Sequence, residues 1–407
     1  MKNKWTYAYR WFMWNIVSFP LVEWLKINYN LSMAPGSGKF PTPPFFVISN
    51  HNTFFDPWIL GGHSMSPFAI MCNDDAFRGS VIQKWYLNSI GAFPKKKGAS
   101  DFSAMKKTIT ILKNGYAVCI FPEGQTSWDG ETQLIYKGLE KIIQRARCPL
   151  MVFRLQGNFL TKPWWAKSRR KGKILMNTKI IPAEEIGKMS SDELLEVIKR
   201  EIYQNDIKDE KNRATCFRGH DMAEGLERFI WICMQCEKED TLITKGNEIS
   251  CLSCGKKWYI DAHCKITAEN NQNAAYEDLK DWSEWHKNKV KSKIKSTSSH
   301  SSLLTSSSDV LFQTEESRHS FADRGKGTLE LTSRNIIFKP EDRSGRELEF
   351  PLDDISNYVI QKKDIFECTY KGNDYRFVFN HHSPMKWVFY VRYLKGYEEL
   401  EEKGYIE

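Results

Sequence analysis

Residues 49–57 read Ser-Asn-His-Asn-Thr-Phe-Phe-Asp-Pro and place His51 five positions before Asp56. The apolar run 44–48 before them predicts a buried strand. Asp56-Pro57 predicts a short helix that opens at Pro57 with Asp56 as its N-cap, because aspartate and proline favour these positions. Residues five apart do not share a helix face, so the two side chains can meet only if the chain turns between them. In that geometry the carboxylate would orient the imidazole as a general base that activates a hydroxyl.

A second strand-like run, residues 116–121, ends in Pro122-Glu123-Gly124. If the two runs are neighbours in an α/β sheet, both loops leave the same sheet edge, which is where such sheets carry their sites. The sequence therefore predicts an α/β sheet domain with His51, Asp56, Glu123 and Gly124 at one edge. A simpler interpretation also stands, in which Asp56 only caps a helix and His51 is an ordinary loop residue.

Two further blocks accompany these loops, in chain order. Residues 91–97 read Gly-Ala-Phe-Pro-Lys-Lys-Lys, and Cys148-Pro149 opens an apolar run at 150–153. With the His-x4-Asp block and residues 121–127, Phe-Pro-Glu-Gly-Gln-Thr-Ser, the set resembles the ordered motifs of the glycerolipid acyltransferase superfamily, the 1-acyl-sn-glycerol-3-phosphate acyltransferases in particular. The resemblance covers residue 40 to about residue 205.

The resemblance implies a reaction and a role for each matched residue. His51 would deprotonate the free hydroxyl of 1-acyl-sn-glycerol 3-phosphate, and the hydroxyl would attack the thioester of acyl-CoA or acyl carrier protein to give phosphatidic acid. It further implies that Asp56 orients His51, that Glu123 and Gly124 bind the acceptor, and that Lys97 beside Lys96 binds its phosphate. No Gly-x-Ser-x-Gly motif indicates a covalent acyl-enzyme.

Two positions depart from the family pattern. Lys97 and Thr126 stand where the family has arginines, which grip phosphate with a planar fork that lysine and threonine lack. The three lysines at 95–97 keep an anionic acceptor as the expectation, and a solvated basic loop is the alternative. Another lysophospholipid or a lipid alcohol is therefore a second acceptor hypothesis. A catalytically silent membrane adaptor is a third reading.

Charge and aromatic residues predict a membrane partner. The net charge of +9 indicates an anionic surface, and no nucleic-acid module accompanies it. Residues 1–40 are rich in tryptophan and tyrosine, but the apolar run 11–25 is too short to span a bilayer. It lacks a small-residue cleavage site. We therefore expect interfacial helices of a peripheral or monotopic protein, with an ordinary core-covering helix as the alternative. The basic, aromatic residues 162–171 are either a second membrane contact or an exposed loop.

Four cysteines have the spacing of a zinc ribbon within residues 208–264: Cys233, Cys236, Cys251 and Cys254. Two Cys-x-x-Cys pairs present four thiolates to one tetrahedral Zn²⁺, which leaves no open position and makes the ion structural. Residues 240–245 and 247–250 between the pairs predict a hairpin. Because reduced thiolates persist in the cytoplasm, the site places the chain on the cytoplasmic face of a membrane.

The remaining chain predicts a tether and a β-rich domain. Residues 265–308 contain a charged helix followed by a flexible serine-rich linker, 296–308. Residues 309–407 show successive short alternating runs and then a helix from Met385 to about Glu402. Together with residues 41–207 as the acyltransferase domain, these give five segments. Short strands closed by one helix resemble pleckstrin-homology-like domains, GRAM domains in particular, which implies binding of a lipid headgroup or a protein.

Overall fold

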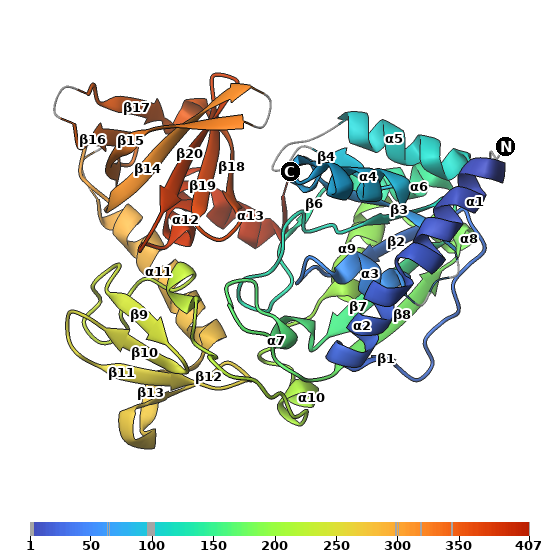
Figure 1. Ribbon diagram of the computed structural model, residues 1–407, viewed down its shortest axis with the longest axis horizontal. Helices are drawn as coiled ribbons and strands as arrows, with labels where there is room; N and C mark the ends of the chain where they lie inside the picture. Colours follow the sequence, from blue (N-terminus) through green and yellow to red (C-terminus); the bar gives the residue numbers. More distant parts are fainter. Residues whose placement is uncertain are drawn as a thin grey trace. The chain divides into compact units, whose positions relative to one another are not determined.

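The structure, a computed structural model, describes residues 4–62, 64, 66–95, 102–297, 299, 301–317, 320–342 and 345–406 (Figure 1). The chain forms two compact units. The first contains Met1–Trp164, Arg169–Gly219 and Gly404–Glu407, and the second contains Trp165–Ser168 and His220–Lys403. The five-segment division made from the sequence stays a prediction.

A seven-stranded sheet forms the centre of the first unit, in the order β1-β8-β7-β2-β5-β3-β4. β2 pairs in parallel with both β5 and β7, whereas β7 and β8 are antiparallel. Every residue of β2 and β5 is buried, as expected of strands covered on both faces. The predicted α/β sheet is confirmed. The bounds are β1 (Leu31–Met33), β2 (Phe46–Ser49), β3 (Phe68–Asn73), β4 (Phe93–Lys95), β5 (Ala117–Ile120), β7 (Leu150–Gln156) and β8 (Ile174–Ile181).

Two apolar cores cover the faces of this sheet because side chains alternate along each strand. Val47 packs with Trp14, Leu25 and Trp58 on one face. Ile48 packs on the other face with residues of α5, α6 and α9. The helices are α1 (Lys4–Phe12), a π-helix (Met13–Val17), α2 (Phe19–Tyr29), α3 (Asp56–Gly61), a 3₁₀ helix (Asp74–Arg78), α4 (Val81–Ser89), α5 (Phe102–Lys113), α6 (Leu139–Ala146), α7 (Asn158–Thr161), α8 (Ala183–Ile186), α9 (Ser191–Ile202) and α10 (Glu210–Arg213). A small second sheet pairs β6 (Ile135–Tyr136) with β21 (Tyr405–Ile406).

The second unit begins, after a 3₁₀ turn (Leu226–Arg228), with an antiparallel sheet in the order β13-β12-β11-β10-β9. The predicted hairpin is confirmed by the pairing of β9 with β10. The segment boundary predicted after residue 264 falls within this sheet, because β12 and β13 continue it up to Asp278. The bounds are β9 (Leu242–Lys245), β10 (Glu248–Cys251), β11 (Lys257–Ile260), β12 (Lys265–Ala268), a 3₁₀ turn (Glu269–Asn271), β13 (Asn273–Asp278) and the following α11 (Leu279–Ser296).

A seven-stranded antiparallel sheet follows α11, in the order β17-β16-β15-β14-β20-β19-β18. Its strands are β14 (Thr305–Ser317), β15 (Ser320–Leu331), β16 (Asn335–Pro340), β17 (Leu348–Pro351), β18 (Ile355–Gln361) after a 3₁₀ turn (Leu352–Asp354), β19 (Ile365–Tyr370) and β20 (Asn373–Phe379). Two helices close it, α12 (Pro384–Leu394) and α13 (Tyr397–Lys403). The predicted β-rich domain with a C-terminal helix is thus confirmed, and its assignment to the GRAM group stays a prediction.

Two details of this region differ from expectation. The linker assigned as flexible ends earlier than residue 308, since Thr305 and Ser307 are buried within β14. Short hydroxyl side chains are tolerated inside when they find hydrogen-bond partners, and Ser307 accepts one from the Trp387 indole. The helix predicted from 385 to 402 is broken at Gly396, whose φ of 79° terminates the first helix.

Within the described ranges, no helix combines the length and apolar character required to cross a bilayer.

Candidate active site

The loops after β2 and β5 meet at one edge of the sheet, because these strands are parallel neighbours. The His51 backbone N–H donates to Glu123 Oε1 at 2.6 Å. The Ser127 N–H donates to the His51 carbonyl oxygen at 3.0 Å. The predicted meeting of the two loops is therefore confirmed, and one backbone–carboxylate and one backbone–backbone hydrogen bond hold them together.

His51 and Asp56 form a direct pair, with 2.8 Å between His51 Nδ1 and Asp56 Oδ2. The Asp56 side chain is fully buried, and its carboxylate also accepts from the loop between the two residues. Oδ2 accepts from the N–H groups of Asn52 and Thr53 at 2.7 and 3.0 Å. Oδ1 accepts from Thr53 Oγ1 at 2.6 Å and from Asn158 Nδ2 at 2.8 Å. The turn that the spacing of His51 and Asp56 requires is thus stabilised by hydrogen bonds to the Asp56 carboxylate.

The helix after this loop corrects one expectation. α3 begins at Asp56 rather than Pro57, and Phe55 occupies its N-cap position without a side-chain cap. The Asp56 carboxylate accepts no hydrogen bond from the helix; its donors lie in the preceding loop and on Asn158. The interpretation that Asp56 merely caps a helix is wrong.

The contacts of Asp56 determine the tautomer of His51. An ionised carboxylate only accepts hydrogen bonds, so the proton between the two side chains belongs to His51 Nδ1. Nε2 then carries the lone pair and is the ring atom able to take a proton. The ring stacks on Phe121 with 4.2 Å between centroids and 24° between planes. With 20% of its side chain exposed, His51 is both held in place and accessible.

Asn158 belongs to the site although no motif pointed to it. It is fully buried and opens α7, directly after Gly157. The buried Asp206 carboxylate accepts from the N–H groups of Gly157 and Phe159, each at 2.7 Å, and so fixes the backbone on both sides of Asn158. Burial raises the pKa of Asp206 to about 6. The sequence signal that could have identified Asn158 is its place just beyond β7, because β7 and β2 are parallel neighbours and end at the same sheet edge.

Replacing Asn158 with alanine is expected to lower turnover about tenfold, since a buried hydrogen bond to a charged group contributes about 1.5–3 kcal/mol. The measurement is kcat as a function of pH, which a change in His51 orientation would shift. Gln361→Ala is the matched control, because Gln361 is also buried but donates to the Glu367 carboxylate at 3.0 Å in the second unit. Equal kcat and pH profiles for Asn158→Ala and Gln361→Ala would contradict a positioning role for Asn158.

Glu123 is buried, with 1% of its surface exposed, and its two oxygens accept from backbone N–H groups. Oε1 takes the His51 N–H and Oε2 takes the Gln133 N–H, both at 2.6 Å. Burial raises the pKa of Glu123 well above its ordinary value. Its observed contacts join two loops, and the acceptor-binding role implied by the family resemblance stays a prediction.

At position 124 the backbone conformation and the space available permit only glycine. Its φ is 68°, and a Cβ atom there would lie 2.8 Å from the ring of Tyr136. The residue lines the same pocket as His51. Glycine at position 124 is therefore required by the backbone conformation and by the close approach of Tyr136.

An apolar pocket opens beside the His51 ring. Its lining is mostly hydrophobic, with Lys95 at its edge above the ring of Tyr136 at 4.7 Å. The apolar lining includes Phe54, Trp58, Ile70, Leu87, Ile120 and Phe121. Lys96 and Lys97 lie outside the described residues, so their predicted phosphate contact is not seen. Lys95 is the described cation of that block.

Cys72 also lines the pocket, and it is the side chain there most easily mistaken for a nucleophile. Burial raises the pKa of Cys72 to about 12, so the group is a neutral thiol near neutral pH. The thiolate, not the thiol, attacks carbonyl carbon. This agrees with direct attack by an acceptor hydroxyl.

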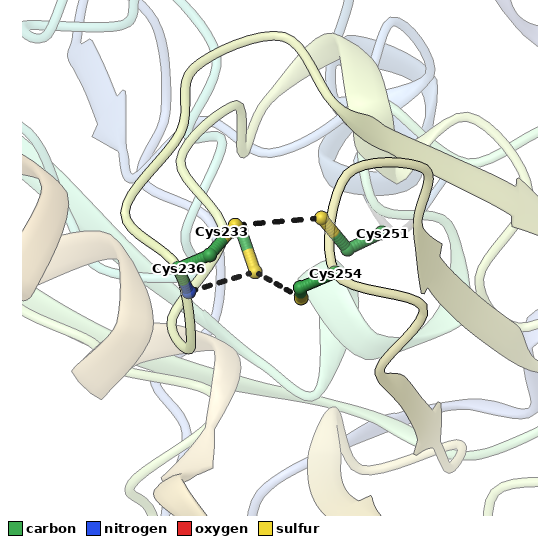
Figure 2. Close-up of side chains that lie close together, drawn as sticks. All are labelled: Cys233, Cys236, Cys251 and Cys254. Carbon is green, nitrogen blue, oxygen red and sulfur yellow. Dashed lines mark hydrogen bonds between the residues drawn. The ribbon is translucent and has the colours of Figure 1, made fainter.

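The four predicted metal ligands converge in the second unit (Figure 2). Sγ–Sγ distances are 3.7 Å for Cys233–Cys254 and for Cys236–Cys251, and all four sulfurs lie within 4.8 Å of one another. A tetrahedral ion with Zn–S bonds of about 2.3 Å requires edges of about 3.8 Å. All four cysteines are free of disulfides. The donor set therefore fits Zn²⁺.

The basic and aromatic stretch 162–171 is partly buried, although Lys167 and Lys171 are exposed. Trp165 and Arg170 are both fully buried. Both sequence interpretations of this stretch are therefore wrong at these positions. Hydropathy alone cannot distinguish a buried tryptophan from one at a membrane surface, because both environments accept an indole ring.

Comparison with known proteins adds an independent finding. Residues 35–155 match the protein family described as Acyltransferase. A chloroplastic 1-acyl-sn-glycerol-3-phosphate acyltransferase of Brassica napus is 28% identical over 116 residues, which are 28% of this chain and 33% of that protein. One of Arabidopsis thaliana is 27% identical over 143 residues, 34% of this chain and 38% of that protein. The match thus spans 33% and 38% of the lengths of the two relatives.

One solved structure, the 1-acyl-sn-glycerophosphate acyltransferase of Thermotoga maritima, is similar to part of this chain. It is 20% identical, with a TM-score of 0.39, over 47% of this chain and 76% of that one. The matched family segment contains β2, β5 and the His51–Asp56 loop. The match of residues 35–155 to the Acyltransferase family and the two similar plant proteins support the O-acyltransferase class that the motifs predict.

Proposed function

We propose that the protein transfers a fatty acyl group from acyl-CoA or acyl carrier protein to the free hydroxyl of 1-acyl-sn-glycerol 3-phosphate, which gives phosphatidic acid. The observation that carries this proposal is the His51 Nδ1–Asp56 Oδ2 pair of 2.8 Å beside an apolar pocket. The names of both plant relatives state the same acceptor.

The reaction follows from the tautomer of His51. Nε2 takes the proton of the acceptor hydroxyl, and the oxygen attacks the thioester carbonyl carbon. The C–S bond then breaks, and the imidazolium returns its proton to the leaving thiolate. The buried Asp56 carboxylate stabilises the imidazolium while it exists, as the carboxylate of a hydrolase triad does.

The pocket lining favours a substrate with an acyl chain and an anionic head. Apolar side chains such as Trp58 and Leu87 exclude water from the chain, while Lys95 places a positive charge near His51. Lys96 and Lys97 follow directly in the sequence and would extend this positive charge to the phosphate. Glu123 and Gly124 would then approach the polar head from the neighbouring loop.

A second acceptor class is supported by a specific observation. Lys97 and Thr126 replace the two arginines of the family pattern, which weakens bidentate phosphate binding. A lysophospholipid with a larger head, or a lipid alcohol, is therefore the second candidate. The intact His51–Asp56 geometry opposes the third reading, a silent membrane adaptor.

Three further properties complete the proposal. The N-terminal helices bind the cytoplasmic surface of a phospholipid membrane, since Phe12, Ile16 and Phe19 are about half exposed, at 49%, 51% and 55%. The Cys233, Cys236, Cys251 and Cys254 thiolates hold one structural Zn²⁺. The C-terminal sheet with α12 is a GRAM-like domain for a lipid headgroup or protein. Nucleic acid is not an expected partner.

A panel of acceptors tests the proposed substrate. Purified protein with acyl-CoA or acyl carrier protein is expected to acylate 1-acyl-sn-glycerol 3-phosphate at least about tenfold faster than acceptors without a terminal phosphate, since a charged hydrogen bond contributes about 1.5–3 kcal/mol. Product formation by mass spectrometry is the readout. Preferential use of a phosphate-free acceptor would overturn the first choice and support the second.

A further inference from the structure

Helix α4 presents an apolar face that no motif accounts for. Val81, Ile82 and Trp85 are 85%, 75% and 53% exposed. Position 85 follows positions 82 and 81 by three and four residues, so all three lie within an arc of about 100° on one side of the helix. Three large apolar side chains together on the surface of a short helix indicate an interaction site rather than scattered exposure.

The opposite face of α4 is part of the active-site pocket. Leu87 is buried and lines the pocket with Trp58. The Trp58 indole N–H donates to the Tyr86 hydroxyl at 2.9 Å, and the two rings stack with 6.3 Å between centroids. One helix thus separates the apolar pocket from the exposed apolar face.

Hydrogen bonds tie α4 to the N-terminal helices. The Tyr86 and Ser18 hydroxyls are 2.7 Å apart, and the Ser89 and Tyr9 hydroxyls are 2.9 Å apart. Ser18 lies at the start of α2, and the exposed Phe19 follows it directly. The apolar face of α4 and the exposed apolar residues of the N-terminal helices therefore belong to elements that are bonded to each other.

We propose that the outer face of α4, formed by Val81, Ile82 and Trp85, inserts into the lipid surface beside the pocket. This proposal rests on the proposed function, since it assigns the route by which an acyl chain passes between bilayer and pocket. The half-exposed Phe54, which also lines the pocket, gives that route an apolar entrance. Tryptophan suits the headgroup boundary, and the exposed Lys84 on the same helix meets anionic headgroups.

A vesicle partition assay with the full chain tests this surface. The variant carrying Val81→Ser, Ile82→Ser and Trp85→Ser is expected to bind phosphatidylcholine vesicles containing phosphatidic acid about a hundredfold more weakly, because three apolar side chains no longer leave water. The matched control carries Ile243→Ser and Leu252→Ser, which are 46% and 71% exposed in the second unit. The control is expected to bind as the native protein does.

Activity measurements separate this proposal from the proposed function. With a short-chain acceptor below its aggregation limit, the α4 variant is expected to keep the native rate, whereas with vesicle-bound acceptor it loses most of it. Native vesicle binding by the variant would overturn the proposal. A native dimer that the variant converts to monomer would also overturn it, in favour of a second copy as the occupant. If the native protein transfers no acyl group but the variant still loses vesicle binding, the α4 surface stands and the proposed function falls.

Discussion

Replacing His51 with alanine is expected to lower the rate of acyl transfer by at least about a hundredfold, the usual effect of removing a general base. The rate is expected to fall because His51 Nε2, whose lone pair accepts the proton, is lost; Nδ1 is hydrogen-bonded to Asp56. Initial rates with saturating thioester and acceptor measure the effect on kcat. Circular dichroism and the melting temperature establish that the variant is folded.

His220 offers a matched control for this substitution. It pairs with Asp221 at 2.6 Å between Nδ1 and Oδ2, but its side chain is 79% exposed in the second unit. His220→Ala is therefore expected to leave the rate unchanged. Acyl transfer at the native rate by His51→Ala would refute the general-base assignment, whatever the control shows.

Removal of zinc is expected to unfold a large part of the second unit rather than the ribbon alone. Glu239 and Asp240 follow the first cysteine pair and bind side chains from the C-terminal sheet and helix. The fully buried Lys386 pairs with Asp240 and donates to the Ser306 carbonyl at 2.7 Å. Leaving such a charge without its partner costs about 3–5 kcal/mol.

Glu239 adds two more contacts that depend on the same backbone. Its oxygens accept from the Tyr390 hydroxyl at 2.8 Å and from Thr305 Oγ1 at 2.7 Å. Because metal binding supplies folding free energy to small Cys₄ modules, its loss releases this segment and the residues it holds. The β13-β12-β11-β10-β9 sheet, β14 and α12 are thus expected to melt together.

Elemental analysis and thermal unfolding measure this effect. One zinc per chain is expected, and chelation or the double substitution Cys251→Ser and Cys254→Ser should remove it and lower the melting temperature of the second unit. The control is Cys216→Ser, since Cys216 is an exposed free thiol outside the cluster. A metal-free protein with native melting and cysteines linked as disulfides would refute the zinc site.

The proximity of His51 to Asp56 and of the four cysteines to one another could be predicted because both signals are local. His51 and Asp56 lie within one loop, and each cysteine pair lies within one turn, so the spacing alone limits the geometry. The strand assignments then placed Glu123 near His51, since parallel neighbours end at one edge. Local spacing and sheet connectivity together were enough for these residues.

The contacts that depend on distant partners could not be read from the sequence. Asn158 donates to Asp56 across a separation of 102 residues in the sequence. Trp165 is buried and Thr305 joins a strand because of tertiary neighbours that composition does not reveal. Hydroxyl-rich and aromatic stretches have no fixed exposure, and their hydrogen-bond partners decide where they lie.

The buried Lys386–Asp240 pair connects the segment after the first cysteine pair with α12. Asp240 follows the first cysteine pair, whereas Lys386 belongs to α12 of the C-terminal domain. A ligand that binds only the ordered form of the C-terminal domain shifts the same folding equilibrium as metal binding does. The coupling between the two binding events is reciprocal. A headgroup that binds the C-terminal domain would therefore raise the affinity of the four thiolates for Zn²⁺. The factor would equal the one by which Zn²⁺ raises the affinity for the headgroup.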